Sequence, residues 1–171
     1  MTRLGMTQRG MTKRGKIFLA TLSVLALAAV VVLGVSGFRI WNDNQAEQAR
    51  KDAVTAASRT VSAMFTYDFQ TVDKELPKAA DNLSPKFKDD YLKLIEQAIA
   101  PGAKEKQLNV KATTQAGGVV SGDKSKVVVL LFLNQVTTSK DSPEGTTTGS
   151  RVRATVEKDG DRWLVDQVTP I

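Results

Sequence analysis

The 171-residue chain contains no cysteine and no histidine. Without cysteine it can form no disulfide, carry no lipidated cysteine of the lipoprotein type and offer no thiolate as a metal ligand or nucleophile. Without histidine it lacks the base of a Ser-His-Asp triad and the usual ligand of catalytic zinc. We therefore expect no metal site and no cofactor, and any acid–base chemistry would fall to Asp, Glu, Lys or Tyr.

The longest stretch without a charged residue is IFLATLSVLALAAVVVLGVSGF, residues 17–38. As a helix it would be roughly 33 Å long, and the hydrocarbon core of a bilayer is about 30 Å thick. We therefore predict a transmembrane helix at residues 17–38. The alternative is a cleaved signal peptide with Val35-Ser36-Gly37 as its cleavage site, although the apolar region of such a peptide is shorter, about 7–15 residues.

Basic residues are concentrated at the N-terminal end of this predicted span, and Arg39 at its other end is followed by acidic residues. Residues 1–16 contain five basic residues and no acidic residue, whereas Asp43 and Glu47 follow the span. The positive-inside rule then keeps the N-terminus in the cytoplasm and places residues 39–171 outside it. The arm, residues 1–16, repeats MTRLG, MTQRG and MTKRG without an apolar period, so we predict that it is disordered. Its methionines Met1, Met6 and Met11 are alternative starts of the protein.

The charge balance outside the arm argues against a nucleic-acid partner. Five of the 24 basic residues lie in the arm and all 18 acidic residues lie beyond the span, so residues 39–171 have 19 basic and 18 acidic residues. The basic excess therefore belongs to a membrane-flanking segment and not to a folded surface. The length of residues 39–171 suits a single extracytoplasmic domain with one core.

Three helices are predicted in the first half of this domain. From Asn42 to about Phe65, apolar residues recur every three or four positions, which predicts a core-facing stripe or, alternatively, a helix that packs on a partner. A second helix is expected at about residues 71–80, capped by Asp68 or Thr71. The third should begin with Ser84 as its N-cap and end at Pro101-Gly102, with one apolar face. That face should be core or, if it is exposed, a binding surface, and it comprises Phe87, Tyr91, Leu94, Ile95, Ala98 and Ile99.

Four strands are predicted in the second half. The first covers Leu108 to Ala112 with Val119 and Val120, and is bulged at Gly117-Gly118. The run at residues 127–133, VVVLLFL, is apolar at every position and predicts a central strand covered on both faces. Residues 151–157 alternate between apolar and polar, and a turn at residues 158–161 leads to a last strand at residues 163–168. The predicted fold is α+β, with about three helices followed by a curved four-strand antiparallel sheet.

This order of elements resembles the cone-shaped fold of SnoaL-like proteins and nuclear transport factor. Three motifs, VLLFLNQ at residues 129–135, RVR at residues 151–153 and WLV at residues 163–165, resemble the Mce-associated membrane proteins of actinobacteria. That resemblance implies a non-enzymatic accessory subunit that stabilises an Mce-type importer of lipids or sterols in the cell envelope. Its implied partners are Mce-domain transporter subunits, and its implied ligand is a lipid or sterol.

Two groups of residues are candidates for a site. A cone fold carries a cavity between its helices and its sheet, and Phe65, Tyr91, Phe132 and Trp163 are the aromatic residues that would line it. The alternative is that they are plain core. An isomerase of the SnoaL kind would need a carboxylate base in an apolar pocket and a proton donor nearby. Asp68 is the candidate base, and Tyr67 or Tyr91 is the candidate donor. The competing interpretation is a helix cap beside core aromatics.

Two further functions stay open at this point. Inner-membrane subunits of type IV secretion machines also join one span to a cone domain, so the chain could serve such a machine. A domain that carries lipid by itself would need an apolar cavity of a few hundred Å³.

The predicted topology can be tested because the chain has no cysteine of its own. A single cysteine introduced in the predicted loop at residues 142–149, as Thr147→Cys, should react with a membrane-impermeant maleimide on intact cells. The arm variant Thr7→Cys should react only after the membrane is permeabilised. Equal labelling of both variants on intact cells would contradict the predicted orientation.

Overall fold

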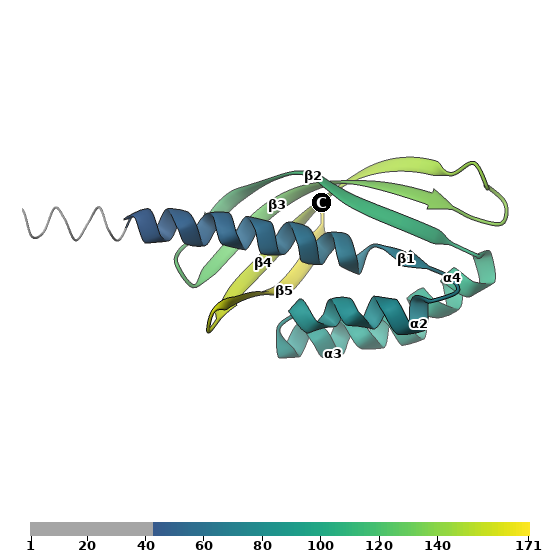
Figure 1. The fold of residues 1–171 in the computed structure, drawn as a ribbon, viewed down its shortest axis with the longest axis horizontal. Coiled ribbons are helices and arrows are strands. Elements are labelled where there is room, and N and C mark those ends of the chain that lie inside the picture. Colours follow the sequence, from purple (N-terminus) through teal and green to yellow (C-terminus); the bar gives the residue numbers. More distant parts are fainter. Residues whose placement is uncertain (1–42) are drawn as a thin grey trace, which may run out of the picture. The chain divides into compact units, whose positions relative to one another are not determined.

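Five antiparallel strands form one sheet in sequence order (Figure 1). The computed structural model describes residues 43–171, so the predicted arm at residues 1–16 and the predicted span at residues 17–38 lie outside the described residues. No helix within residues 43–171 is long and apolar enough to cross a bilayer. The strands are β1 Tyr67–Asp68, β2 Asn109–Gly122, β3 Lys126–Thr138, β4 Thr146–Asp159 and β5 Arg162–Pro170.

All helices of residues 43–171 precede β2 in the sequence, and the short strand β1 lies between the first helix and α2. The first helix covers residues 43–64. After β1 come α2 Val72–Glu75, the 3-10 helix η1 Leu76–Asn82, α3 Pro85–Leu94, the π-helical turn η2 Ile95–Ile99 and α4 Ala100–Lys106. The predicted α+β class is confirmed. The predicted count of four strands is wrong, because the two-residue β1 adds a fifth strand through pairing with Val110 and Asn109, and so short a strand leaves no periodic signal.

The helices cover one face of the sheet only. Along β3, Val127, Val129, Leu131 and Leu133 are buried, whereas the side chains between them are half-buried or exposed. The prediction that residues 127–133 form a strand covered on both faces is therefore wrong. An unbroken apolar run does not show which face is covered, and here every helix packs against the same one.

The first helix packs on this face through small side chains. Ala49, Ala53 and Ala57 are buried at four-residue spacing, and Val61 continues the line. This confirms the core-facing stripe that the sequence predicts. Gly117 of β2 permits the close approach, because a Cβ there would lie 2.7 Å from Leu131 Cδ2 and 3.3 Å from Val54 Cγ1.

Hydroxyl side chains in the last turns of the first helix and directly after it bond to the edge of β2. The Thr114 N–H donates to Ser62 Oγ at 3.1 Å, and the Ala112 N–H donates to Thr66 Oγ1 at 3.0 Å. The Thr114 hydroxyl donates to the Ser58 carbonyl at 3.1 Å and lies 2.8 Å from Ser62 Oγ. Because β1 pairs with only two residues of β2, these hydroxyls satisfy backbone groups that would otherwise form an open sheet edge.

The third predicted helix begins as expected and ends later than expected. Ser84 caps α3, since its Oγ accepts from the Phe87 N–H at 3.3 Å, which confirms the predicted N-cap. The prediction that Pro101-Gly102 ends the helix is wrong, because the chain continues helical to Lys106. Proline lacks an N–H and fits the first turn of α4, and the wider turn η2 directly precedes it.

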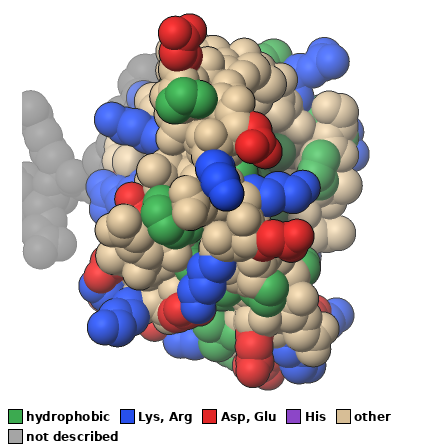
Figure 2. Space-filling view, turned by 90° about the vertical axis from the view of Figure 1, so that its right-hand side faces the viewer, with side chains coloured by type: hydrophobic (Ala, Val, Ile, Leu, Met, Phe, Trp, Pro, Cys, Tyr) green, Lys and Arg blue, Asp and Glu red, His purple; other side chains and the backbone are tan. Residues whose placement is uncertain are grey.

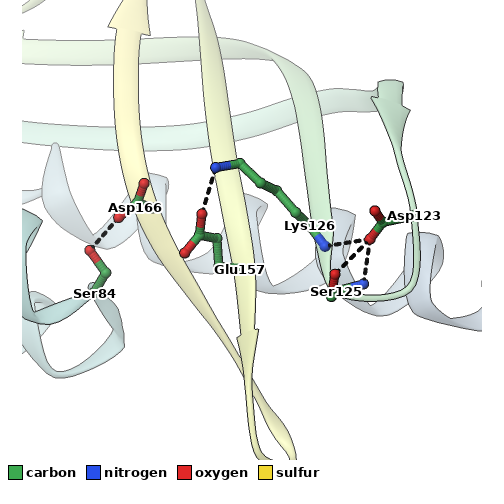
Figure 3. A network of polar contacts seen from close by, with 6 residues as sticks. All are labelled: Ser84, Asp123, Ser125, Lys126, Glu157 and Asp166. Atoms are coloured by element: carbon green, nitrogen blue, oxygen red, sulfur yellow. Dashed lines mark hydrogen bonds and ion pairs between the residues drawn. The ribbon is translucent and has the colours of Figure 1, made fainter.

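Ser84 also fastens the opposite edge of the sheet. Its N–H donates to the Val165 carbonyl at 2.9 Å, and its hydroxyl donates to Asp166 Oδ1 at 2.6 Å (Figure 3). Leu83 forms a parallel bridge with Val165 at the same point. The start of α3 is therefore attached to β5, which fixes the helices beneath the sheet.

Two tight turns connect the long strands. In the β2–β3 turn, Asp123 Oδ1 accepts from the Ser125 and Lys126 N–H groups at 2.7 and 2.9 Å (Figure 3), and these bonds lower the pKa of the Asp123 carboxyl. In the β4–β5 turn, Gly160 has a φ of +58°. The predicted turn is present, but its two loop residues are Gly160 and Asp161, and only Gly160 has a positive φ.

The strand β2 is bulged on both sides of the predicted position. Its pairing with β3 shifts between Thr114 and Ala116 and again between Val119 and Ser121. Gly117 and Gly118 lie between the two shifts and are themselves paired. The predicted interruption of this strand is therefore two bulges within one continuous strand.

Removing the Ser62 hydroxyl should destabilise the domain. Ser62→Ala leaves the part-buried Thr114 N–H without its acceptor, so we expect a loss of about 1–2 kcal/mol in the free energy of unfolding. Thr55→Ala is the matched control, because the Thr55 hydroxyl is exposed and bonds only to the Lys51 carbonyl of its own helix. Denaturant unfolding of the purified chain in detergent measures both. Equal stability of the two variants would show that the hydrogen bonds to β2 contribute little to the free energy of unfolding.

Candidate functional site

An apolar cavity of about 440 Å³ opens at the C-terminal end of the first helix, between α3 and the end of β5. Its volume falls within the range of about 300–1,000 Å³ typical of small-molecule sites. Its walls are mainly aromatic and aliphatic side chains. The lining residues are Met64, Phe65, Tyr67, Phe87, Asp90, Tyr91, Leu94, Ile99, Val168 and Pro170.

Regular helix and strand periods bring these side chains together. Phe87, Tyr91 and Leu94 are spaced by four and three residues, so they lie on one face of the helical segment. Val168 and Pro170 alternate along β5 and therefore point to the same side of the sheet. Leu94 is 51% exposed, so it lies at the mouth of the cavity and is not core as the sequence predicts.

Tyr91 is the buried polar group of the cavity. Its hydroxyl donates to the Met64 carbonyl at 3.0 Å, at the end of the first helix. Burial raises the pKa of Tyr91 far above its ordinary value, and the nearby Tyr67 raises that pKa further. The Tyr91 hydroxyl is therefore neutral and held by a structural hydrogen bond, which joins α3 to the first helix.

Tyr67 offers the cavity a hydroxyl that is not engaged. It is half-buried, and within residues 43–171 its hydroxyl makes no hydrogen bond. Burial raises the pKa of Tyr67, which keeps this hydroxyl protonated near neutral pH. Among the lining residues only Asp90 carries a charge, and its side chain is exposed. The cavity thus combines apolar walls with one free hydroxyl and one carboxylate.

The residues predicted for an isomerase-like site are not brought together in this cavity. Tyr67 lines the cavity, but Asp68 does not, and Asp68 is exposed. Asp68 Oδ1 accepts from the Gln70 N–H at 2.7 Å and so closes the turn after β1. The prediction that Asp68 or Thr71 caps the second helix is wrong, because Thr71 precedes α2 without a side-chain cap bond.

The four aromatic candidates for the cavity lining are placed in three different environments. Phe65 and Tyr91 line the cavity. Trp163 is 9% exposed and belongs to the core between the helices and the sheet. Phe132 is 44% exposed and lies on the uncovered face of the sheet. Sequence reasoning missed Val168 and Pro170 as lining residues, although their alternation along the last strand was a usable signal.

A second hollow, of about 660 Å³, lies between the first helix and the far end of β2. Charged side chains of both signs line it, including Glu47, Arg50 and Lys51. Arg50 Nη2 donates to the Gly122 carbonyl at 3.4 Å across it. Residues 43–171 contain no group of three or more Asp and Glu side chains placed to hold a metal ion. We therefore regard the apolar cavity as the candidate site.

The fold is similar to that of solved structures that include the periplasmic domain of DotI and an IcmL-like protein. The periplasmic domain of DotI aligns with a TM-score of 0.59 and 19% identity, covering 69% of this chain and 91% of that domain. An IcmL-like type IV secretion system protein from Legionella pneumophila aligns with a TM-score of 0.59 and 15% identity, covering 71% and 93%. A nuclear transport factor 2-like protein from Salmonella enterica aligns with a TM-score of 0.47 and 12% identity, covering 70% of this chain and 89% of that chain.

The chain belongs to the family of uncharacterized proteins described as Rv1363c/MT1408-like, whose family model matches residues 18–169. The outer membrane protein Rv1973 of Mycobacterium tuberculosis is 38% identical over 149 residues, covering 85% of this chain and 91% of that protein. The uncharacterized protein Rv1362c of the same organism is 31% identical over 153 residues, covering 86% and 70%. The family match begins inside the apolar run at residues 17–38.

The two cavity tyrosines should differ in their effect on stability. Tyr91→Phe removes the buried bond to Met64 and should lower the free energy of unfolding by about 1–2 kcal/mol, whereas Tyr67→Phe should change it little. Because the pKa of Tyr91 is raised on folding, its contribution is full below about pH 10 and declines as the pH rises further. The difference between wild type and Tyr91→Phe should therefore shrink in denaturant unfolding above about pH 10. Equal destabilisation by both substitutions would contradict the assignment.

Proposed function

We propose that the chain is a non-enzymatic accessory subunit of a multi-subunit complex in the cell envelope. It is held by one span, and its domain lies outside the cytoplasm. The observation that carries the proposal is the fold, which matches periplasmic domains of secretion-system proteins over about 70% of the chain. The name of Rv1973, an outer membrane protein, also supports an envelope location.

The finer proposal is a subunit that stabilises an Mce-type importer of lipids or sterols. Its support is the sequence resemblance in the motifs at residues 129–135, 151–153 and 163–165. The family's relatives in Mycobacterium tuberculosis are compatible with an actinobacterial family. The partners would be Mce-domain subunits, and a lipid or sterol would fit the apolar walls of the cavity.

A second candidate is a subunit of a type IV secretion-like machine. The structures of similar fold favour it, because they include DotI, an IcmL-like type IV secretion system protein and the VirB8 homologue CagV of Helicobacter pylori, which aligns with a TM-score of 0.55. Their identity to this chain is 13–19%, which speaks for the fold alone. An isomerase is a less favoured candidate, since the exposed Asp68 lies outside the apolar cavity.

The proposal predicts stable partners in native membranes. The full chain, mildly crosslinked, solubilised in detergent and affinity-purified, should bring down Mce-domain subunits with their permease or ATPase, as identified by mass spectrometry. Secretion-system subunits in their place would establish the second candidate. Recovery of the chain alone, with a bound lipid or turnover of a small hydrophobic substrate, would overturn the accessory role.

A further inference from the structure

The uncovered face of the sheet carries an apolar stripe along β3. Val128 and Leu130 are half-buried there, and Phe132 and Val136 are each 44% exposed. They alternate with the buried residues of β3, so they point away from the helices. Single exposed apolar side chains are common on protein surfaces, but here four apolar side chains share one face of β3, with the polar Asn134 between Phe132 and Val136.

Small residues flank this stripe on one side. In the pairing of β2 with β3, Ala116 lies opposite Phe132, Gly118 opposite Leu130 and Ser121 opposite Val128. Directly opposite residues share one face of the sheet, with Cβ atoms about 5 Å apart. Because these β2 side chains are small or absent, they leave the large β3 side chains uncovered.

Two arginines flank the stripe on its other side. In the pairing of β3 with β4, Arg151 lies opposite Phe132 and Arg153 opposite Leu130. Both are exposed, and neither forms an ion pair or a hydrogen bond through its side chain with any other residue in 43–171. Lys111 of β2 lies beside Val136 on the same face.

The acidic side chain nearest this stripe on β4 is already paired. Glu157 Oε1 lies 2.6 Å from Lys126 Nζ, near the β4–β5 turn (Figure 3). Within residues 43–171, Arg151 and Arg153 therefore form no ion pair, and their positive charges lie beside the apolar stripe. The end of the domain seen in Figure 2 differs, because acidic and basic side chains are interspersed there with scattered hydrophobic ones.

We propose that this arginine face, formed by Leu130, Phe132, Val136, Arg151 and Arg153, binds an acidic amphipathic segment of a partner protein. Apolar side chains of the segment would cover the β3 stripe, and its carboxylates would accept hydrogen bonds from the two guanidinium groups, which suit bidentate pairing. The inference rests on the proposed function, because it requires a partner in the complex.

Charge selects this occupant over two others. A second copy docked face to face would place the arginine pairs of both copies together, and such like-charge contacts are unfavourable. An anionic bilayer would satisfy the arginines, but the apolar side chains lie in the middle of a flat sheet face and not on a projecting loop or an amphipathic helix that could insert. An elongated protein segment satisfies both the apolar and the charged groups.

The test replaces Phe132 by the photocrosslinking amino acid p-benzoylphenylalanine in the full chain in native membranes. This residue is also aromatic and the position is exposed, so folding should be preserved. The control position is Leu94, which is 51% exposed at the cavity mouth. We expect position 132 to capture a protein segment with a net negative charge, and Arg151→Gln with Arg153→Gln to reduce that capture about tenfold. Position 94 should not capture that segment.

The captured segment is then made as a peptide and titrated against the full chain in a neutral detergent. Its affinity should fall at least about tenfold in the double arginine variant and weaken as salt is raised. The matched control is Lys86→Gln with Lys93→Gln, which removes two exposed positive charges from α3 and should leave the affinity unchanged.

Several outcomes would overturn the inference. The first is that position 132 captures nothing. The second is that it captures a second copy of the chain, a lipid, or a protein segment that is neutral or basic. The third is that the double arginine variant binds the peptide as tightly as the wild-type chain. If the wild-type chain still co-purifies with a complex in any of these cases, the surface is wrong and the accessory role stands. If the wild-type chain co-purifies with nothing, the accessory role itself fails.

Discussion

The domain depends on the contact between the first helix and the edge of β2. Thr66 and Ser62 accept the Ala112 and Thr114 N–H groups that a longer β1 would otherwise bond. A buried or half-buried N–H without an acceptor costs about 1–3 kcal/mol, so this helix serves as a substitute for a sheet neighbour. Its alanine stripe then allows it to lie close on the sheet, with Gly117 beneath it.

This arrangement gives the sheet two different faces. All helices pack on one side, and the Ser84 bonds to Val165 and Asp166 hold α3 there against β5. Within residues 43–171 no helix covers the opposite side, so Phe132 and Val136 of β3 are exposed there. One face thus supplies the core and the apolar cavity at its end, whereas the other supplies an apolar and positively charged surface.

The chemistry of the cavity favours binding over proton transfer. Tyr91 is neutral because burial raises its pKa, and its hydroxyl is already committed to the Met64 carbonyl. The free Tyr67 hydroxyl can donate or accept one hydrogen bond, and the carboxylate of Asp90 is solvated. A ligand with a large apolar body and one polar group would match such walls.

The sequence by itself determined the α+β class, the buried stripe of the first helix, the Ser84 cap and the turn at Gly160, because each depends on local periodicity or on the side chain of a single residue. Tertiary structure decided the rest. The run at residues 127–133 is apolar on both sides, so only the placement of the helices showed that Phe132 faces outward. Whether Phe65, Tyr91 and Trp163 line a cavity or fill the core depended on how closely α3 packs against β5. Pro101 did not end its helix because the wider turn η2 directly precedes it, so the N–H that proline lacks is not needed for a helical hydrogen bond. That turn leaves no mark in the sequence.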